Sequence, residues 1–531
     1  MGEPFEIYPY SIERLTSILV EKSISNTDII ENKLHLLYFQ EYFQHLETKT
    51  ILVENDYIDK DFLEDYASYY VRCFSEYKRK CTRLHFFKKE FDLEDFNSLL
   101  NKKDQTLSEK LQQDYLGFIV VKPLPLTIIG RTCLTTYPQE EGEERYFPIT
   151  RKYDVHLFGL HLLVDSLGFQ EQDNVVAACA TSTLWSVFHQ TGILFHHSIL
   201  SPVEITKAAT KQLPIETRTF PNKGLSSEQM AQAIRGVSLE PLLVEVKNDE
   251  YYLKSYLYAY LRSGIPVIFG IELFGIRDNR YKLIGRHAAA VAGYRLHGKR
   301  TTGVVEKDVQ LVSSKISKIY VHDDQVGPFS RMVFDSPKIE VTENGEEKNL
   351  VALSTSWKTG EYPIGSVKAV PKILLIPMYH KIRISFDVIH KTIRVFNSIL
   401  EELKENIAAL PYERFCWDIY LTDVNKLKSE ILDSKALKGN YYRGILLGNM
   451  PRFIWRATAI QGDSPVIDLL FDATDIEQGR YFILPIEYKK SFSDLLRWLF
   501  KEDFFGKIPR NNPAWEIIHW FRKNKERNTV S

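Results

Sequence analysis

The chain has 531 residues, and its 68 Lys and Arg residues nearly balance 69 Asp and Glu residues, so the formal net charge is −1. This balance argues against a broad electrostatic surface for nucleic acid. A hydrophobic content of 44% and a charged content of 26% are those of an ordinary globular chain, and they argue against disorder, collagen and a coiled-coil rod. At about 150 residues per domain, the length predicts roughly three to four domains.

The cysteine pattern and the first residues bear on the compartment. The five cysteines are odd in number and include no C-x-x-C pair, so a disulfide framework and a paired-cysteine zinc site are not indicated. The beginning of the sequence has no basic and apolar leader, and no stretch reaches about 18 uncharged apolar residues. We therefore expect a cytoplasmic protein with no membrane span, no metal and no cofactor.

In chain order, residues 1–110 are predicted to be mainly helical. From Asp61 to Tyr77 the aromatic residues recur at mostly three- and four-residue steps, which indicates one apolar helix face. The run LGFIVVK at 116–122 predicts a strand that ends before Pro123.

The centre of the chain shows helix signals first and strand signals later. A helix is predicted from about Ala180 to Gln190, with Gly192 as its stop signal, and Ser201 and Ser226 each open a capping box. A further helix and four strands are expected, at 249–263 for the helix and at 242–247, 267–273, 287–296 and 317–323 for the strands. This order favours an α+β fold over a doubly wound one.

The last third of the chain is predicted to be a separate α/β unit. Its expected strands are 373–378, 452–458 and 466–471, and its expected helices are 386–407 and 421–436. The predicted domains are therefore a helical region (1–110), a central domain (111–371) and a C-terminal domain (372–531).

Three central residues have the types and the order that thiol catalysis needs. A cysteine nucleophile reacts as the thiolate, which the start of a helix stabilises, and Cys179 stands where the predicted helix begins. His287 opens a strand of small residues and could serve as the base, while Asp323 ends the next strand and could orient the imidazole. Taken alone, a cysteine such as Cys179 is more often an inert core thiol.

These segments resemble papain-like cysteine peptidases, and most closely the bacteriocin-processing branch. In that branch a Gln precedes a Cys-Gly pair, a strand reads G-H-x-x-V-V-x-G-Y, and a later strand ends in N-D-P. Gly285 to Tyr294 is similar to the second motif, with Arg286 inserted. The resemblance covers about residues 150–335 and implies a papain-like core, in which a helix-first lobe packs on an antiparallel sheet.

The strand-end motif leaves two candidate acids. Tyr320 to Asp323 matches its register, with His322 where the family has Asn and Asp324 where it has Pro. Register favours Asp323 as the acid, and Asp324 remains the alternative.

The first motif departs further from the family. Ala180 stands where the family has Gly, and Gln172 precedes Cys179 by seven residues where the family's oxyanion Gln precedes its cysteine by six. Asp173 has the family's spacing, but a carboxylate repels an oxyanion. The resemblance therefore assigns the oxyanion role to Gln172, which requires one extra residue in the loop.

The pattern predicts a thiol hydrolase that cleaves a peptide or isopeptide bond, with Cys179, His287 and Asp323 as a triad. The alternatives are a thiol acyltransferase or amidase on the same triad and a non-catalytic binding protein on the same scaffold, with a bacterial defence or toxin system as one possible setting. The expected partner is a peptide or protein substrate, without nucleic acid or membrane. We expect residues 1–110 and 372–531 to restrict access to the cleft or to mediate self-association, and to supply no catalytic group.

Overall fold

The fold was analysed in a computed structural model of the full chain. The structure describes residues 3–102, 105–140, 142–173, 178–211, 224–298, 309–334, 338–343, 346–406, 414–434, 437, 439–476, 480–501 and 508–524. The chain forms two units, each assembled from more than one segment. Unit 1 comprises Met1–Asn248, Gly264–Arg295 and Ser317–Met378, and unit 2 comprises Asp249–Ser263, Leu296–Ile316 and Tyr379–Ser531.

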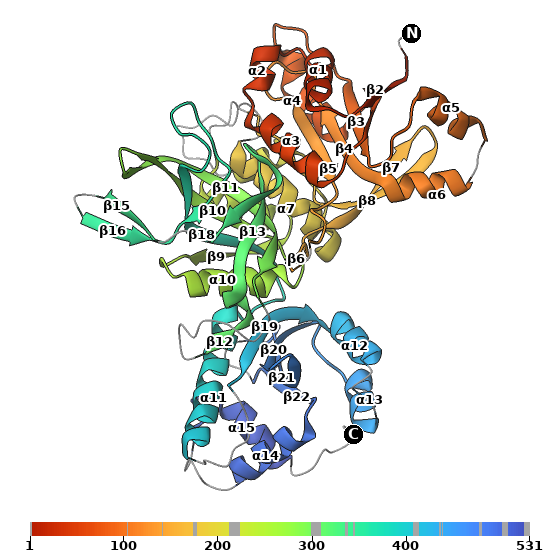
Figure 1. The fold of residues 1–531 in the computed structure, drawn as a ribbon. Coiled ribbons are helices and arrows are strands. Elements are labelled where there is room, and N and C mark those ends of the chain that lie inside the picture. Colours follow the sequence, from red (N-terminus) through yellow and green to blue (C-terminus); the bar gives the residue numbers. More distant parts are fainter. Residues whose placement is uncertain are drawn as a thin grey trace. The chain divides into compact units, whose positions relative to one another are not determined.

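The first sheet of unit 1 is antiparallel and has the strand order β1-β2-β3-β4-β5 (Figure 1). Its strands are β1 (Phe5–Pro9), β2 (Thr50–Tyr57), β3 (Cys81–Phe87), β4 (Tyr115–Val121) and β5 (Ile129–Leu134). Around it lie α1 (Ile12–Lys22), α2 (Thr27–Glu31), α3 (Leu34–His45), α4 (Lys60–Ser68), η1 (Tyr70–Arg72), α5 (Leu93–Lys102) and α6 (Gln105–Asp114).

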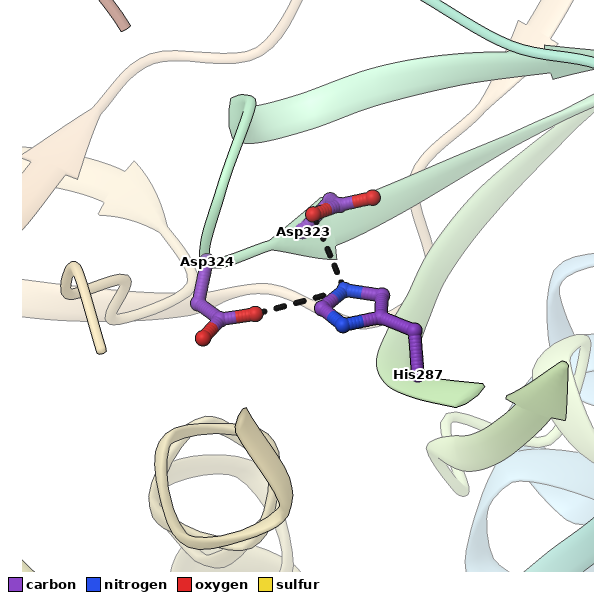
Figure 2. Close-up of side chains that lie close together, drawn as sticks. All are labelled: His287, Asp323 and Asp324. Carbon is purple, nitrogen blue, oxygen red and sulfur yellow. Dashed lines mark hydrogen bonds and ion pairs between the residues drawn. The ribbon is translucent and has the colours of Figure 1, made fainter. Parts of the chain in front are cut away.

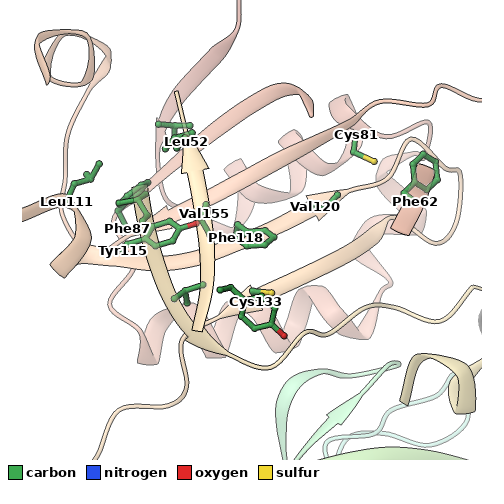
Figure 3. Packing of buried hydrophobic residues seen from close by; sticks show 14 of the residues in the cluster. Leu52, Phe62, Cys81, Phe87, Leu111, Tyr115, Phe118, Val120, Cys133 and Val155 are labelled. Carbon is green, nitrogen blue, oxygen red and sulfur yellow. The ribbon is translucent and has the colours of Figure 1, made fainter. Parts of the chain in front are cut away.

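Both faces of this sheet are covered. On one face, Phe86 of β3 stacks on Phe43 of α3, with ring centroids 4.2 Å apart. On the other face, Phe87 belongs to a cluster that includes the hairpin of β7 (Arg151–Leu157) and β8 (Leu160–Ser166) (Figure 3). Because neighbouring strand residues point to opposite faces, a doubly covered strand is buried along its whole length, as β3 is.

Residues 1–110 contain more helix than strand, as predicted, but the prediction missed the three strands β1, β2 and β3. Buried polar residues obscure the strand signal in β3: Arg83 and His85 both contact the Glu54 carboxylate of β2, at 2.6 and 3.2 Å. The predicted aromatic helix also ends early, at Ser68, and Phe74 is fully exposed.

The second sheet of unit 1 closes on itself. Its path runs β10-β11-β13-β14-β17-β18, and β18 pairs again with β10. Beyond that ring, β9 extends from β18 and β6 pairs with β11. The strands are β6 (Glu144–Tyr146), β9 (Leu239–Glu245), β10 (Val267–Arg277), β11 (Arg280–Leu296), β13 (Ile316–Asp323), β14 (Gly327–Val333), β17 (Leu353–Ser354) and β18 (Val367–Tyr379). A separate hairpin consists of β15 (Ile339–Glu343) and β16 (Glu346–Leu350).

Helix α7 (Cys179–Phe195) packs against this ring and is buried over most of its length. It ends at His196, which has a left-handed backbone (φ 58°). Gly192 is therefore not the stop that we predicted: it lies inside the helix, where a Cβ would come within 2.9 Å of the Ile199 side chain. Both predicted capping boxes are confirmed, at the starts of α8 (Pro202–Ala209) and α9 (Ser227–Gly236).

Unit 2 is built on a five-stranded sheet of order β12-β19-β20-β21-β22. Its strands are β12 (Gln310–Leu311), β19 (Cys416–Asp423), β20 (Phe453–Gln461), β21 (Ser464–Asp472) and β22 (Phe482–Glu487). Its helices are α10 (Glu250–Leu261), η2 (Val312–Lys315), α11 (Phe386–Asn406), α12 (Val424–Asp433), α13 (Asn440–Leu447), α14 (Lys490–Lys501) and α15 (Trp515–Lys523). The helix predicted at 421–436 begins only at Val424, because residues 421–423 complete β19.

The two units divide the chain differently from the three predicted segments. A cut between residues 110 and 111 would separate β3 from β4, which share an antiparallel ladder, and a cut between 371 and 372 would fall within β18. Helix α10 belongs to unit 2, where Tyr258 donates a hydrogen bond of 2.9 Å to Asp418 of β19.

The mixture of helices with mainly antiparallel sheets confirms the α+β class. None of the helices in the described ranges has both the length and the apolar composition needed to cross a bilayer.

We predict that a 111–371 fragment does not fold alone, contrary to the expectation of an independent central domain. Removing β1–β3 leaves the ladder edge of β4 unpaired and exposes side chains that are buried along that whole strand. Far-UV circular dichroism and thermal melting of the fragment, compared with the full chain, should show aggregation or no cooperative transition. A cooperative, monomeric fragment would contradict the shared-sheet argument.

Candidate functional site

His287 lies on β11, inside the closed sheet of unit 1. It pairs with Ile271 of β10 on one side, and β13 is the neighbouring strand on the other. Gly293, at the far end of the same motif, is required by packing, because a Cβ there would come within 2.5 Å of the Tyr146 carbonyl oxygen in β6. The motif therefore lets β6 approach β11 closely while β11 presents His287.

Asp323 is the last residue of β13 and lies next to His287. Its Oδ1 is 3.0 Å from Nε2 of His287, and both side chains are almost completely buried (Figure 2). The backbone N–H of Gln325 donates a further hydrogen bond of 3.1 Å to the same oxygen. His322, one residue earlier, contacts the Gly168 carbonyl oxygen instead, at 3.2 Å.

Cys179 is the first residue of α7, as predicted, and a side-chain hydrogen bond with Cys179 is among the causes that raise the pKa of His287. The contact brings together residues that are 108 positions apart in the sequence. One turn further along α7, the Thr183 hydroxyl donates a hydrogen bond of 3.0 Å to the carbonyl oxygen of Ala288, which follows His287. This bond holds the start of α7 against β11. Cys179 is partly exposed, whereas the imidazole and the carboxyls behind it are buried.

The two carboxyl contacts of His287 share one ring nitrogen. Both carboxyl contacts reach Nε2, as the dashed lines in Figure 2 show. Burial by itself would lower the pKa of His287, but the charges of Asp323 and Asp324 outweigh it and raise that pKa well above its usual value. For Asp323, burial would raise the pKa, but the charge and hydrogen bond of His287 lower it. The site thus favours an imidazolium paired with an ionised Asp323.

Asp324 is a second carboxyl at the same nitrogen. Its Oδ1 lies 3.3 Å from Nε2 of His287, close enough for an ion pair, yet neither carboxyl oxygen accepts a hydrogen bond from the residues that the structure describes. Burial raises the pKa of Asp324 to about 7, with Asp323 adding to the rise and His287 opposing it. The two adjacent acids are therefore in different environments, since Asp323 accepts hydrogen bonds from three groups and the side chain of Asp324 accepts none from the described part of the chain.

Trp357 completes the surroundings of Asp323 and was not among the predicted site residues. Its indole Nε1–H donates a hydrogen bond of 2.7 Å to Oδ2 of Asp323. Its ring also meets the His287 imidazole edge to face, with centroids 5.0 Å apart. Trp357 lies outside the three motifs, so no local pattern pointed to it.

The oxyanion role of Gln172 stays a prediction. Gln172 is half-buried, and residues 174–177, which separate it from Cys179, lie outside the described residues. Asp173 has a different role, since its Oδ2 accepts a hydrogen bond from the Tyr70 hydroxyl of η1.

One group of residues has the donor types of a cation site. Among the residues in the described ranges, only His287, Asp323 and Asp324 bring three such ligand atoms within 4.8 Å of one another. The hydrogen bonds from His287, Gln325 and Trp357 already account for both oxygens of Asp323. An acid–imidazole pair therefore explains this arrangement without an ion.

The remaining cysteines differ from Cys179 in their environments. Cys81 and Cys133 lie in the core cluster of the first sheet (Figure 3), where burial raises the pKa of both thiols, that of Cys133 to about 12. Cys416 is buried in β19, and Cys73 is partly exposed. Of the five, only Cys179 contacts the imidazole of the candidate site.

No known family model matches the chain, and no curated protein matches it significantly.

We predict that Asp324→Asn changes how stability depends on pH. The carboxyl has a pKa of about 7 in the folded protein, against an ordinary value of 3.8, so the folded state holds the extra proton. Stability from this group is therefore lost as the pH rises from about 4 to 7. The variant lacks this loss. Between about pH 5 and pH 8, its free energy of unfolding should therefore rise by about 1–3 kcal/mol relative to that of the wild-type protein.

Melting temperatures of both proteins at the two pH values check this, with Asp165→Asn as the control at an exposed strand position. A difference between wild type and Asp324→Asn that stays constant with pH would show that Asp324 is ionised throughout.

Proposed function

We propose that the protein is a papain-like thiol hydrolase that cleaves a peptide or isopeptide bond. The observation that carries the proposal is the placement of His287, which contacts the Cys179 side chain and, through Nε2, the Asp323 carboxylate. The packing of α7 on a closed, mainly antiparallel sheet supports the papain-like part of the proposal.

The roles follow from the contacts. Cys179 attacks the substrate carbonyl as the thiolate, with the start of α7 and the His287 imidazolium stabilising the negative sulfur. His287 then gives its proton to the leaving amine, and a thioester to Cys179 remains. Water, activated by the now neutral imidazole, hydrolyses the thioester and restores the thiolate and the imidazolium. Asp323 holds the ring in place and stabilises its charged form.

The oxyanion of the tetrahedral intermediate forms beside the first turn of α7. Ala178, the residue before the helix, makes no side-chain cap, and the start of a helix favours negative charge. We assign the Cys179 N–H and the Gln172 amide to this role, as the resemblance implies.

The acyl-enzyme is the same whether water or an amine accepts the acyl group. Product analysis with and without an added amine separates a hydrolase from an acyltransferase. A binding protein on this scaffold would form no acyl-enzyme at all.

The proposal predicts that iodoacetamide labels Cys179 faster than the other four cysteines near neutral pH. The thiolate is the reactive form, and the His287 imidazolium stabilises it at Cys179 alone. Site-resolved mass spectrometry of the native protein measures all five rates together. Cys73, also partly exposed, is the matched control for accessibility.

His287→Ala should slow labelling of Cys179 and leave that of Cys73 unchanged. If Cys179 labels no faster than Cys73 in the wild-type protein, Cys179 is not an activated nucleophile and the non-catalytic alternative applies.

A further prediction ranks the two acids. Asp323→Asn should reduce turnover of a model thioester or peptide by about 10-fold to 10⁴-fold, because it removes the charge that holds the imidazolium. Asp324→Asn should reduce turnover less, since Asp324 accepts no hydrogen bond from the described residues. The kcat values of the two variants decide the matter, and the opposite ranking would transfer the orienting role to Asp324.

A further inference from the structure

Helix α3, far upstream in the sequence, lies against the turn that follows Asp323 and begins with Asp324. This turn connects β13 to β14 and contains Asp324, Gln325 and Val326. Inside the turn, the N–H of Val326 donates to the carbonyl oxygen of Asp323 at 3.0 Å. Two side chains of α3 also donate hydrogen bonds to the backbone of this turn and of the strand that follows it.

His35, in the first turn of α3, holds the acid segment directly. Its Nε2 lies 3.0 Å from the backbone oxygen of Asp324, 289 positions later in the chain. A carbonyl oxygen only accepts hydrogen bonds, so Nε2 carries the proton and donates it. His35 is almost fully buried, and burial lowers its pKa, with Glu171 and Asp323 opposing and Lys33 adding to this change. His35 therefore acts as a hydrogen-bond donor to the acid segment, and burial favours its neutral form.

Tyr38, one turn further along α3, holds the other end of the turn. Its hydroxyl donates to the backbone oxygen of Pro328 in β14. Its ring lies so close to Gly327 that a Cβ there would come within 2.2 Å of the ring, and Gly327 also has a left-handed backbone (φ 157°). Only glycine fits this position, so the contact between α3 and the turn is specific.

Two ion pairs flank these bonds. Lys33, just before α3, pairs with Glu171 in the segment that leads to Cys179, and both side chains are largely buried. Glu41, further along α3, pairs with Arg331 of β14 at the surface. Helix α3 therefore contacts both the acid-bearing turn and the segment upstream of the nucleophile.

We propose that His35 is a positioning residue of the active site, and that α3 sets where Asp323 and Asp324 lie relative to His287. This inference rests on the proposed thiol hydrolase function. It also revises the expected division of labour, because residues 1–110 then shape the catalytic centre, although they supply no group that touches the substrate.

The physical consequence of losing this support is predictable. Asp323 stabilises the imidazolium through one hydrogen bond of 3.0 Å in a buried site, where a small displacement weakens the charge interaction strongly. A misplacement of about 1 Å can cost roughly 100-fold in rate. A weaker imidazolium supports less thiolate at Cys179, so alkylation of Cys179 should need a higher pH.

The experiment measures the rate of iodoacetamide labelling at Cys179 against pH, in full-length proteins kept below their melting temperatures. His35→Leu removes the donor and keeps a buried apolar side chain, and it should slow labelling roughly 10-fold near pH 7 and move the midpoint upward. His35→Gln keeps an N–H donor at similar reach and should restore most of the rate. In an Asp323→Asn background, His35→Leu should add little, since its effect acts through that acid.

Tyr38→Phe and Tyr42→Phe provide a matched pair on the same helix. Both tyrosines are buried and donate to a backbone carbonyl, but the Tyr42 hydroxyl binds Thr135 after β5, at 2.5 Å, and not the acid turn. Tyr38→Phe should shift the labelling profile in the same direction as His35→Leu, and Tyr42→Phe should leave it unchanged. This pair decides the question even if His35→Leu does not fold.

The outcomes separate this inference from the proposed function. If wild-type Cys179 labels no faster than Cys73, both are overturned. If wild-type Cys179 is activated but His35→Leu and Tyr38→Phe keep its pH profile, only the positioning role of α3 is overturned. Equal shifts in Tyr38→Phe and Tyr42→Phe would also overturn it, because they would reflect a general loss of stability.

Discussion

The hydrogen bond between His287 and Asp323 is the interaction on which the candidate site depends. An imidazole taken out of water loses its affinity for a proton, and the acid beside it restores that affinity. The arrangement works only if the acid stays ionised, which the Gln325 N–H and the Trp357 indole ensure by donating to it. Cys179 can then be partly exposed to solvent while His287 and Asp323, which activate it, remain buried.

The adjacent carboxyls of Asp323 and Asp324 have pKa values shifted in opposite directions, and the difference follows from their hydrogen bonds. Asp323 accepts three donors, whereas the oxygens of Asp324 accept none from the described residues. The backbone of Asp324 nevertheless matters, because its carbonyl oxygen receives His35. Asp324 thus links α3 to the turn between β13 and β14 through its main chain. Its side chain adds a second acid, with a raised pKa, beside the imidazole.

Local patterns predicted the parts of the site that depend on neighbouring residues. The start of α7 at Cys179, both capping boxes and the end of β13 at Asp323 follow from turn chemistry and periodicity, and the structure confirms them. The strand β3 was missed because Arg83 and His85 interrupt its apolar pattern, and their partner Glu54 lies in another strand, β2. Trp357, His35 and Tyr38 could not be found, since each acts through a contact with a distant part of the chain.

The interleaving of the two units has a consequence for biosynthesis. The chain leaves unit 1 after Asn248 to make α10, returns to it for β10 and β11, and completes the ring only when β18 appears. Helix α10 likewise cannot make its contact with β19, in unit 2, until β19 has been synthesised. During translation, apolar surfaces made early therefore stay uncovered until more than a hundred further residues have emerged. The nascent chain should accordingly depend on chaperones, and premature termination after β11 should yield a product that proteases remove rather than a working half.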